Sequence, residues 1–150
     1  MATMAAERVF LDTNILCYAY LGQSPFQRPA LEELEKLQAR GAEIHVSRQV
    51  LREYVAAMSK HGVLPVPVPM SGLIENVRDF ARSFAVLEDR ADVTELWLEL
   101  LADTATAGRQ VHDAYIVATM LAYQVPVLLT HNVSDFKRFG SRISVKPLLP

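Results

Sequence analysis

The sequence predicts an α/β fold: a three-layer α/β/α sandwich around a mostly parallel sheet of about five strands. Short apolar runs, typical of buried strands, alternate along the chain with longer runs that have helical periodicity. One or two helical segments separate each pair of successive strands. This spacing requires crossover connections, which make the strands parallel and cover both faces of the sheet.

Composition narrows the class of protein. The chain has 150 residues, of which 51% are hydrophobic, as expected for one folded domain spanning 1–150. Its net charge of -2 gives no global basic field, so any contact with nucleic acid would be local. The single cysteine, Cys17, fits a reducing compartment and excludes a disulfide framework. Residues 1–6 contain no signal core, and the apolar run 114–129 is too short for a bilayer, so we expect a soluble, cytoplasmic protein without membrane contact.

Capping residues and glycines divide the first half of the chain. Small polar residues, which accept hydrogen bonds from a helix's first amides, precede the expected helices, and glycines follow them. The expected elements are a strand over 9–11, a helix after Asp12-Thr13-Asn14 that Gly22 ends, a helix capped by Ser24 with Pro25 in its first position and Gly41 after its end, a strand over 44–46, and a helix capped by Ser47 and ended by Gly62.

The second half begins with a proline-rich segment, 64–69. Proline alternates there with aliphatic residues, and because proline lacks an N–H the segment predicts an extended connection rather than a ladder strand. Asp92 and Glu95 form a capping-box pattern that is expected to open a later helix. The other expected elements are a helix over 71–82, a strand over 85–87, the capped helix through Ala102, a loop over 103–108, a helix over 111–123, a strand over 127–129, a helical turn over 136–139 and an edge strand over 143–145.

Acidic residues recur where the carboxyl ends of the strands should meet. Asp12 follows the first strand, Glu53 lies at the edge of the apolar stripe after the second, Asp113 begins the helix before the fourth, and Asp135 follows the fourth. Carboxylates beside apolar residues are costly unless a cation neutralises them. Converging acids without cysteines or a matched histidine pair are typical ligands of Mg²⁺ or Mn²⁺ rather than Zn²⁺.

Each acid also has a structural interpretation. Asp12 could cap the following helix, Asp113 could complement a helix dipole, Asp135 could cap the turn at Phe136, and Glu53 could be a boundary residue. These roles would all have to coincide at one end of the sheet, so a shared site is favoured. His112 and His131 lack ligand spacing and are expected at the rim or in structural roles. Possible phosphate contacts near the acids are Arg109, Lys137 and Arg138.

Taken together, several segments resemble the PIN-domain ribonucleases, and within them the VapC-like toxins of bacterial toxin–antitoxin pairs. The segments are 10–14, the mid-chain helix with Glu53, 112–118 and 129–136. The resemblance covers essentially the whole chain, although 64–69 matches nothing in the family's pattern. It implies catalytic acids at Asp12, Glu53, Asp113 and Asp135, with the metal held by Asp12, Asp113 and Asp135, and polar supports at Thr13, Asn14, Thr130 and Asn132. Some members carry an acid at the position of Asn132, so either Asn132 or Asp135 is expected to complete the metal site.

The resemblance implies a Mg²⁺- or Mn²⁺-dependent endoribonuclease that cleaves single-stranded or structured RNA and leaves a 5′-phosphate and a 3′-hydroxyl. It also implies a homodimer bound to a cognate antitoxin. Two alternatives stay open. A catalytically inert PIN-fold module could bind RNA or protein, although the intact acid set argues against it. A phosphatase of the haloacid-dehalogenase type needs a second acid two residues after Asp12, where this chain has Asn14.

Overall fold

A single parallel sheet organises the chain, and its strand order is β3-β2-β1-β4-β5. The computed structural model describes residues 5–60, 62, 64 and 66–150. Every neighbouring pair of strands is parallel, which confirms the predicted sheet. The strands are β1 (Arg8–Leu11), β2 (Glu43–Ser47), β3 (Ala85–Leu87), β4 (Val127–Thr130) and β5 (Ser144–Pro147).

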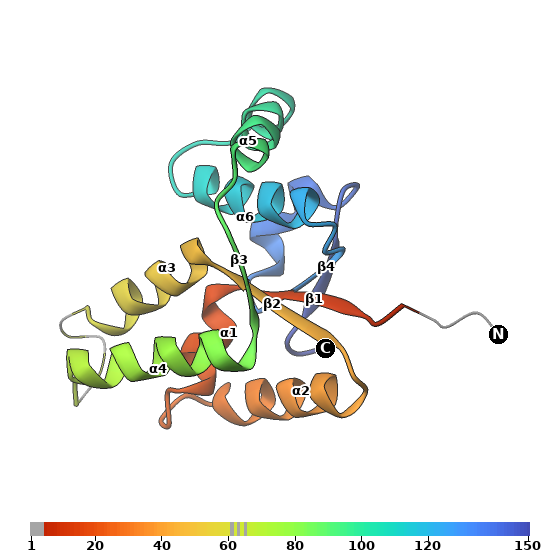
Figure 1. The fold of residues 1–150 in the computed structure, drawn as a ribbon. Helices are drawn as coiled ribbons and strands as arrows, with labels where there is room; N and C mark the ends of the chain where they lie inside the picture. The colour runs from red at the N-terminus through yellow and green to blue at the C-terminus, as the bar shows by residue number, and fades with distance from the viewer. Residues whose placement is uncertain (1–4, 61, 63, 65) are drawn as a thin grey trace.

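Helices cover both faces of this sheet, so the predicted three-layer sandwich is confirmed. Figure 1 shows α1, α2 and α4 on one side of the strands and α5 and α6 on the other. Helix α3 packs against α1 and α4, and α5 packs along α6. The helices are α1 (Thr13–Ala19), α2 (Gln27–Ala39), α3 (Arg48–Met58), α4 (Met70–Ser83), α5 (Ala91–Asp103), α6 (Gln110–Ala122) and a 3-10 helix, η1 (Val133–Phe139). In the part of the chain that the structure describes, no helix is long and apolar enough to cross a membrane.

The strand order reverses next to β1. The chain runs outward from β1 through β2 to β3, then returns to place β4 on the other side of β1. In α/β sheets the crevice at such a switch point, outside the carboxyl ends of the strands, is where ligands bind. Leu11 of β1 is in register with Leu129 of β4, so Asp12 and Thr130, the next residues, emerge side by side.

The core lies on both sides of β1. Val9, Phe10 and Leu11 are all fully buried, because side chains that point to either face of β1 meet a helical layer. Helix α6 is buried through Ala114 and Ile116 to Met120, since it lies between the sheet and α5. The strongly apolar composition of 111–123 therefore matches a helix that is covered by other elements on two sides.

The predicted start of the second helix was wrong. Helix α2 begins at Gln27, so Ser24 is not its cap and Pro25 is not its first residue. The Ser24 hydroxyl instead accepts a hydrogen bond of 3.1 Å from the Phe26 N–H in the preceding turn. Phe26 is held before the helix because its ring packs on Tyr18 and His131, at centroid distances of 4.9 and 4.3 Å.

The capping box predicted for Asp92 and Glu95 was also wrong. Helix α5 begins at Ala91 with Arg90 as its N-cap, and Asp92 lies in the first turn. The Arg90 guanidinium binds both oxygens of Asp92, at 2.9 and 2.6 Å, so this carboxylate pairs with an arginine. Arg90 also donates to the Ala122 carbonyl at 3.1 Å, which ties the start of α5 to the end of α6.

Of the three glycine stops, only Gly41 is confirmed. Its φ is 74°, its N–H donates to Gln38 O at 3.1 Å, and the next N–H donates to Leu37 O, which is a Schellman end for α2. Helix α1 ends at Ala19 and α3 ends at Met58, before Gly22 and Gly62 respectively. The C-cap of α1 is Tyr20 and that of α3 is Ser59, and the N–H of each donates to a carbonyl in the last turn of its helix.

The remaining boundaries shift by a few residues. Within the predicted connection over 64–69, residues 64 and 66–69 belong to no helix or strand, and Pro65 lies outside the described residues. The helical turn near Phe136 begins earlier, at Val133, and the last strand is β5 rather than 143–145. Pro147 is tolerated in β5 because this strand forms the edge of the sheet.

Candidate functional site

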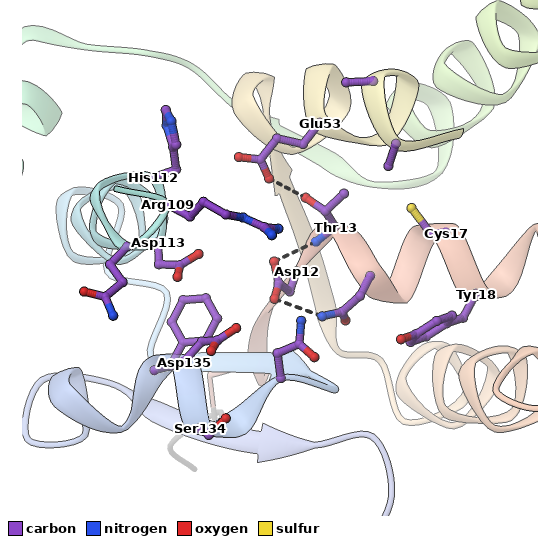
Figure 2. A pocket seen from close by; sticks show the side chains of 16 residues that line it. Asp12, Thr13, Cys17, Tyr18, Glu53, Arg109, His112, Asp113, Ser134 and Asp135 are labelled. Atoms are coloured by element: carbon purple, nitrogen blue, oxygen red, sulfur yellow. Dashed lines mark hydrogen bonds between the residues drawn. The ribbon is translucent and has the colours of Figure 1, made fainter. Parts of the chain in front are cut away.

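A pocket of about 810 Å³ opens at the switch point between β1 and β4. Its lining includes the four predicted acids, Asp12, Glu53, Asp113 and Asp135, which come from the end of β1, from α3, from α6 and from η1. Figure 2 shows their side chains around the same space. The fold therefore brings together residues that are far apart in the sequence.

Asp12 is the most buried of these acids, with 7% of its surface exposed. Its Oδ1 accepts from the Thr13 N–H at 2.8 Å, and its Oδ2 accepts from the Thr130 hydroxyl at 2.7 Å and from the Asn14 amide at 3.2 Å. Asp12 is also the N-cap of α1, so the structural interpretation of this residue is confirmed.

The electrostatic environment of Asp12 disfavours its charge despite these donors. Burial raises the pKa of Asp12 to about 6, the hydrogen bonds from Thr130 and Thr13 oppose this rise, and the negative charges of Glu53 and Asp135 add to it. A carboxylate in this position would gain from a nearby cation.

Glu53 is held at both carboxylate oxygens. Its Oε2 accepts from the Thr13 hydroxyl at 2.7 Å, and its Oε1 accepts from the Gln49 side-chain amide at 2.8 Å. Thr13 thus contacts two acids, Asp12 through its N–H and Glu53 through its hydroxyl. The orientation of Glu53 is consequently fixed before any ligand binds.

Asp113 and Asp135 differ from the first pair, because within the described residues neither carboxylate accepts a hydrogen bond from a side chain. Partial burial, followed by the charges of Asp12, Asp135 and Glu53, raises the pKa of Asp113 to about 6, and Arg109 opposes the rise. Asp135 lies in the first turn of η1. These two carboxylates are therefore free to bind a ligand.

The expected polar supports form one network around Asp12. The Asn14 amide also donates to Thr130 Oγ1 at 3.3 Å, and its oxygen accepts from the His131 N–H at 3.2 Å. The Thr130 hydroxyl accepts from the Asn132 N–H at 3.0 Å. The Asn132 side chain itself lines the pocket and is exposed, as is that of Asp135.

The three basic residues lie in different settings. Arg109 lines the pocket, and Figure 2 shows its guanidinium directed into the space between Glu53 and Asp113. Arg138 donates to the Ala105 carbonyl at 2.9 Å and so holds the loop before α6. Neither Arg138 nor Lys137 is part of the pocket lining. Only Arg109 is thus positioned to touch a ligand in this pocket.

The donor set fits a hard divalent cation in its chemistry. Four carboxylates offer oxygen ligands, and burial together with mutual repulsion raises the pKa values of Asp12 and Asp113, an effect that a bound cation would oppose. Among the residues that the structure describes, no three His, Cys, Asp or Glu side chains are already placed to hold one ion.

Several pocket residues were not predicted from the sequence. Cys17, Tyr18, Gln110 and Ser134 line the pocket and were not expected there, whereas the rim position expected for His112 is confirmed. Burial raises the pKa of the Cys17 thiol to about 12, so it is no nucleophile at neutral pH. Gln49, which binds Glu53, was also missed. Its signal was available, because it lies four residues before Glu53 and so shares a helix face with it.

Comparison with known proteins places this chain in a family. The model of the PIN domain matches residues 9–141, so the chain belongs to the PIN domain family. Ribonuclease VapC37 of Mycobacterium tuberculosis is 25% identical over 142 residues, which are 93% of this chain and 97% of the relative.

Solved structures show the same fold. A structure of VapBC2 from Rickettsia felis bound to a promoter DNA fragment matches with a TM-score of 0.68 and 22% identity, over 93% of this chain and 97% of that one. DNA-bound VapBC from Salmonella typhimurium matches with a TM-score of 0.69 and 18% identity, over 95% and 98% of the two chains.

Proposed function

We propose that this protein is a divalent-metal-dependent endoribonuclease that acts as the toxin of a toxin–antitoxin pair. The observation that carries the proposal is the convergence of four acids from four separate elements on one pocket at the switch point of the sheet. The name of the ribonuclease relative and the toxin–antitoxin complexes among similar structures support it.

In this proposal Asp12, Asp113 and Asp135 hold Mg²⁺ or Mn²⁺. When bound, the ion supplies the positive charge that activates water for in-line attack on phosphorus and stabilises the departing 3′ oxygen. Thr130 and the Thr13 N–H fix the Asp12 carboxylate. Glu53, held at both oxygens, orients the attacking water. The products are a 5′-phosphate and a 3′-hydroxyl.

Arg109 is proposed to contact the substrate backbone. It is exposed, lines the pocket and points between Glu53 and Asp113. Without a metal, the positive charge of Arg109 lowers the pKa of Asp113, against the larger effects of burial and the neighbouring acids. With a metal ion held by the acids, the guanidinium would be available to a phosphate of the substrate. Local positive charge of this kind allows a chain with a net charge of -2 to bind RNA.

We further propose a cognate antitoxin and a homodimer as the physiological assembly. An acid-lined pocket favours bidentate binding of an arginine, so an antitoxin that inserts one would neutralise the site and block substrate. Among the described residues, large apolar side chains are exposed on three helices: Leu31 on α2, Met70 and Ile74 on α4, and Leu98 on α5. Partner surfaces would remove such groups from water.

RNA cleavage by the purified chain tests the function. The full chain is incubated with total RNA and Mn²⁺ or Mg²⁺, with EDTA as the metal-free control and Asp113→Asn as the matched variant. We expect cleavage that EDTA and Asp113→Asn both abolish, with 5′-phosphate ends on the products. Asp113 is the better choice than Asp12, because its carboxylate accepts no side-chain hydrogen bond in the described structure and its loss should not disturb the fold.

The same assay separates the alternatives. RNA binding without cleavage by the metal-loaded chain would favour the inert PIN-fold module. A phosphatase would release phosphate from a small ester, but the residue two positions after Asp12 is Asn14, whose amide and oxygen are committed to Asp12, Thr130 and the His131 N–H. The structure therefore gives a phosphatase no second acid at that position.

A further inference from the structure

Gln49 is a buried polar residue next to the acid pocket. It lies in the first turn of α3, one helical turn before Glu53, and 6% of its surface is exposed. Its side-chain Nε2 donates two hydrogen bonds, one to Glu53 Oε1 at 2.8 Å and one to the backbone carbonyl of His112 at 3.0 Å. A single amide group thus contacts one acid directly and the residue beside a second acid, Asp113.

These contacts determine which way the amide faces. Both partners of Nε2 are acceptors, so a flipped amide would place its oxygen against a carboxylate and a carbonyl. The Gln49 Oε1 atom has no hydrogen-bond partner in the described structure. An apolar side chain would fill this space without burying an unpartnered acceptor. We therefore attribute the presence of a glutamine here to the two hydrogen bonds that its Nε2 donates.

Gln49 completes a chain of hydrogen bonds across the site. The chain runs from the His112 carbonyl through Gln49 to the Glu53 carboxylate, and from there through the Thr13 hydroxyl and N–H to Asp12. It joins α6, α3 and α1, the elements that carry or flank three of the acids. Among the described residues, the bond from Gln49 to His112 is the hydrogen bond that links α3 to α6.

We propose that Gln49 is a positioning residue that sets the separation of Glu53 and Asp113. It holds the first turn of α6, and hence Asp113, at a fixed distance from the Glu53 carboxylate. One hydrogen bond, from Thr13, would leave the Glu53 carboxylate free to rotate, whereas a second on the opposite oxygen fixes its plane. This inference rests on the proposed metal-dependent function, because it assigns Gln49 to the geometry of that site.

Gln49→Met tests the inference, since methionine has similar length but no N–H to donate. Tyr54→Phe is the matched control. Tyr54 is on the same helix as Gln49 and next to Glu53, and its loss removes a 2.8 Å hydrogen bond from Asn76 of α4 without touching the acids. Residues that hold metal ligands in place typically contribute about 10–100-fold to metal affinity or activity, and Gln49 would act on the ligand Asp113 through the first turn of α6. We therefore expect Gln49→Met to weaken Mn²⁺ binding by about tenfold or more in titrations of the RNA-free chain. Tyr54→Phe should leave Mn²⁺ affinity unchanged.

A second readout does not depend on metal. Hydrogen exchange of the amides over 111–115 is measured in EDTA, because release of the His112 carbonyl should loosen the first turn of α6. Faster exchange there in Gln49→Met, but not in Tyr54→Phe, is expected. Unchanged exchange would overturn the inference whether or not the wild type binds Mn²⁺. Failure of the wild type to bind Mn²⁺ or to cut RNA would instead contradict the proposed function.

Metal binding supplies the other contradictory outcome. If wild-type protein binds Mn²⁺ and Gln49→Met binds it equally well, Gln49 does not position the acids. Cleavage rates of Gln49→Met are then measured at saturating Mn²⁺. Activity that returns to the wild-type rate indicates a defect in metal binding, and activity that stays low indicates misplacement of Glu53. Either result supports a positioning role for Gln49. A loss of activity of equal size in Tyr54→Phe would show that any change in α3 has the same effect, and would contradict this role.

Discussion

The hydroxyl of Thr130 donates a 2.7 Å hydrogen bond to Asp12 Oδ2, although the two residues are 118 positions apart. The register of β1 and β4 places them side by side, because Leu11 pairs with Leu129. Both residues are buried, so this bond stabilises a charged carboxylate where water cannot. It also lowers the pKa of Asp12, against the larger effect of burial.

Removal of that hydroxyl should therefore reduce stability. Thr130→Val keeps the shape but loses the bond to Asp12 and leaves the Asn132 N–H without its acceptor. Losing a hydrogen bond to a charged group costs about 1.5–3 kcal/mol. At roughly 2–4 °C per kcal/mol, the melting temperature at pH 7.5 should fall by about 3–12 °C. Thr130→Ser, which keeps the hydroxyl, is the control, and equal melting of wild type and Thr130→Val would contradict the assigned role.

Metal binding should raise the melting temperature. A ligand that binds only the native state adds about 2.7 kcal/mol when its free concentration is a hundredfold above Kd. Saturating Mn²⁺ should thus raise the wild-type melting temperature by about 5–11 °C. Asp113→Asn should show a much smaller rise and, in EDTA, should melt at or above the wild-type temperature, because one of four facing charges is gone. A wild-type curve indifferent to Mn²⁺ and Mg²⁺ would argue against the metal site.

The acids should give the metal-free protein an unusual pH dependence. Burial and mutual repulsion raise the pKa values of Asp12 and Asp113 to about 6, above their unfolded values near 4. The native state then binds more protons between these limits, so their contribution to stability grows as pH falls from 7 toward 4. His45 acts in the opposite direction, because burial and then Arg8 lower its pKa.

The comparison with Asp113→Asn isolates this effect, since His45 is common to both proteins. Melting temperatures are measured in EDTA at pH 5 and pH 7. The wild type should gain more, or lose less, than Asp113→Asn on acidification. Identical shifts in the two proteins would show that Asp113 titrates normally in the folded state.

Arg109 should contribute to RNA affinity through a phosphate contact. Arg109→Gln removes the charge that points into the pocket, and Arg28→Gln, outside the pocket lining, is the surface control. For single-stranded RNA, the slope of log K against log salt should fall by about 0.7 in Arg109→Gln only. Binding is measured by fluorescence anisotropy with Asp113→Asn as background to prevent cleavage. Equal slopes for Arg109→Gln and Arg28→Gln would remove Arg109 from the interface.

Expression in bacteria tests the toxin assignment. The wild-type chain, expressed without an antitoxin, should slow growth, whereas Asp113→Asn at the same protein level should not. Coexpressed antitoxin should restore growth if it covers the acid pocket. Normal growth of the wild-type strain, with the protein detected by immunoblot, would favour the inert binding module.

How much of this could be predicted from the sequence depends on the range of the interactions involved. The parallel sheet and its helical layers follow from local patterns of apolar residues. Short continuous apolar runs at 9–11 and 127–129 indicate the buried strands β1 and β4. The Ser47 cap is equally local, and its hydroxyl does accept from the Val50 N–H. The helix start predicted at Ser24 was wrong because Phe26 packs on aromatic rings from other segments, Tyr18 and His131. The capping box at Asp92 was wrong because the neighbouring Arg90, which also donates to the Ala122 carbonyl of α6, pairs with that carboxylate.

The sequence by itself also indicated which four acids share the pocket: Asp12 and Asp135 follow strands, and Glu53 and Asp113 lie on helices next to the same edge of the sheet. Only the tertiary structure decided how they differ. Asp12 is buried among three donors, Glu53 is held at both oxygens, and Asp113 stays free beside Arg109. These environments arise from the register of β1 with β4 and from the approach of α3 to α6. Burial and hydrogen bonds between distant segments set most of each environment, and local patterns supply only single contacts, such as that of Gln49 with Glu53.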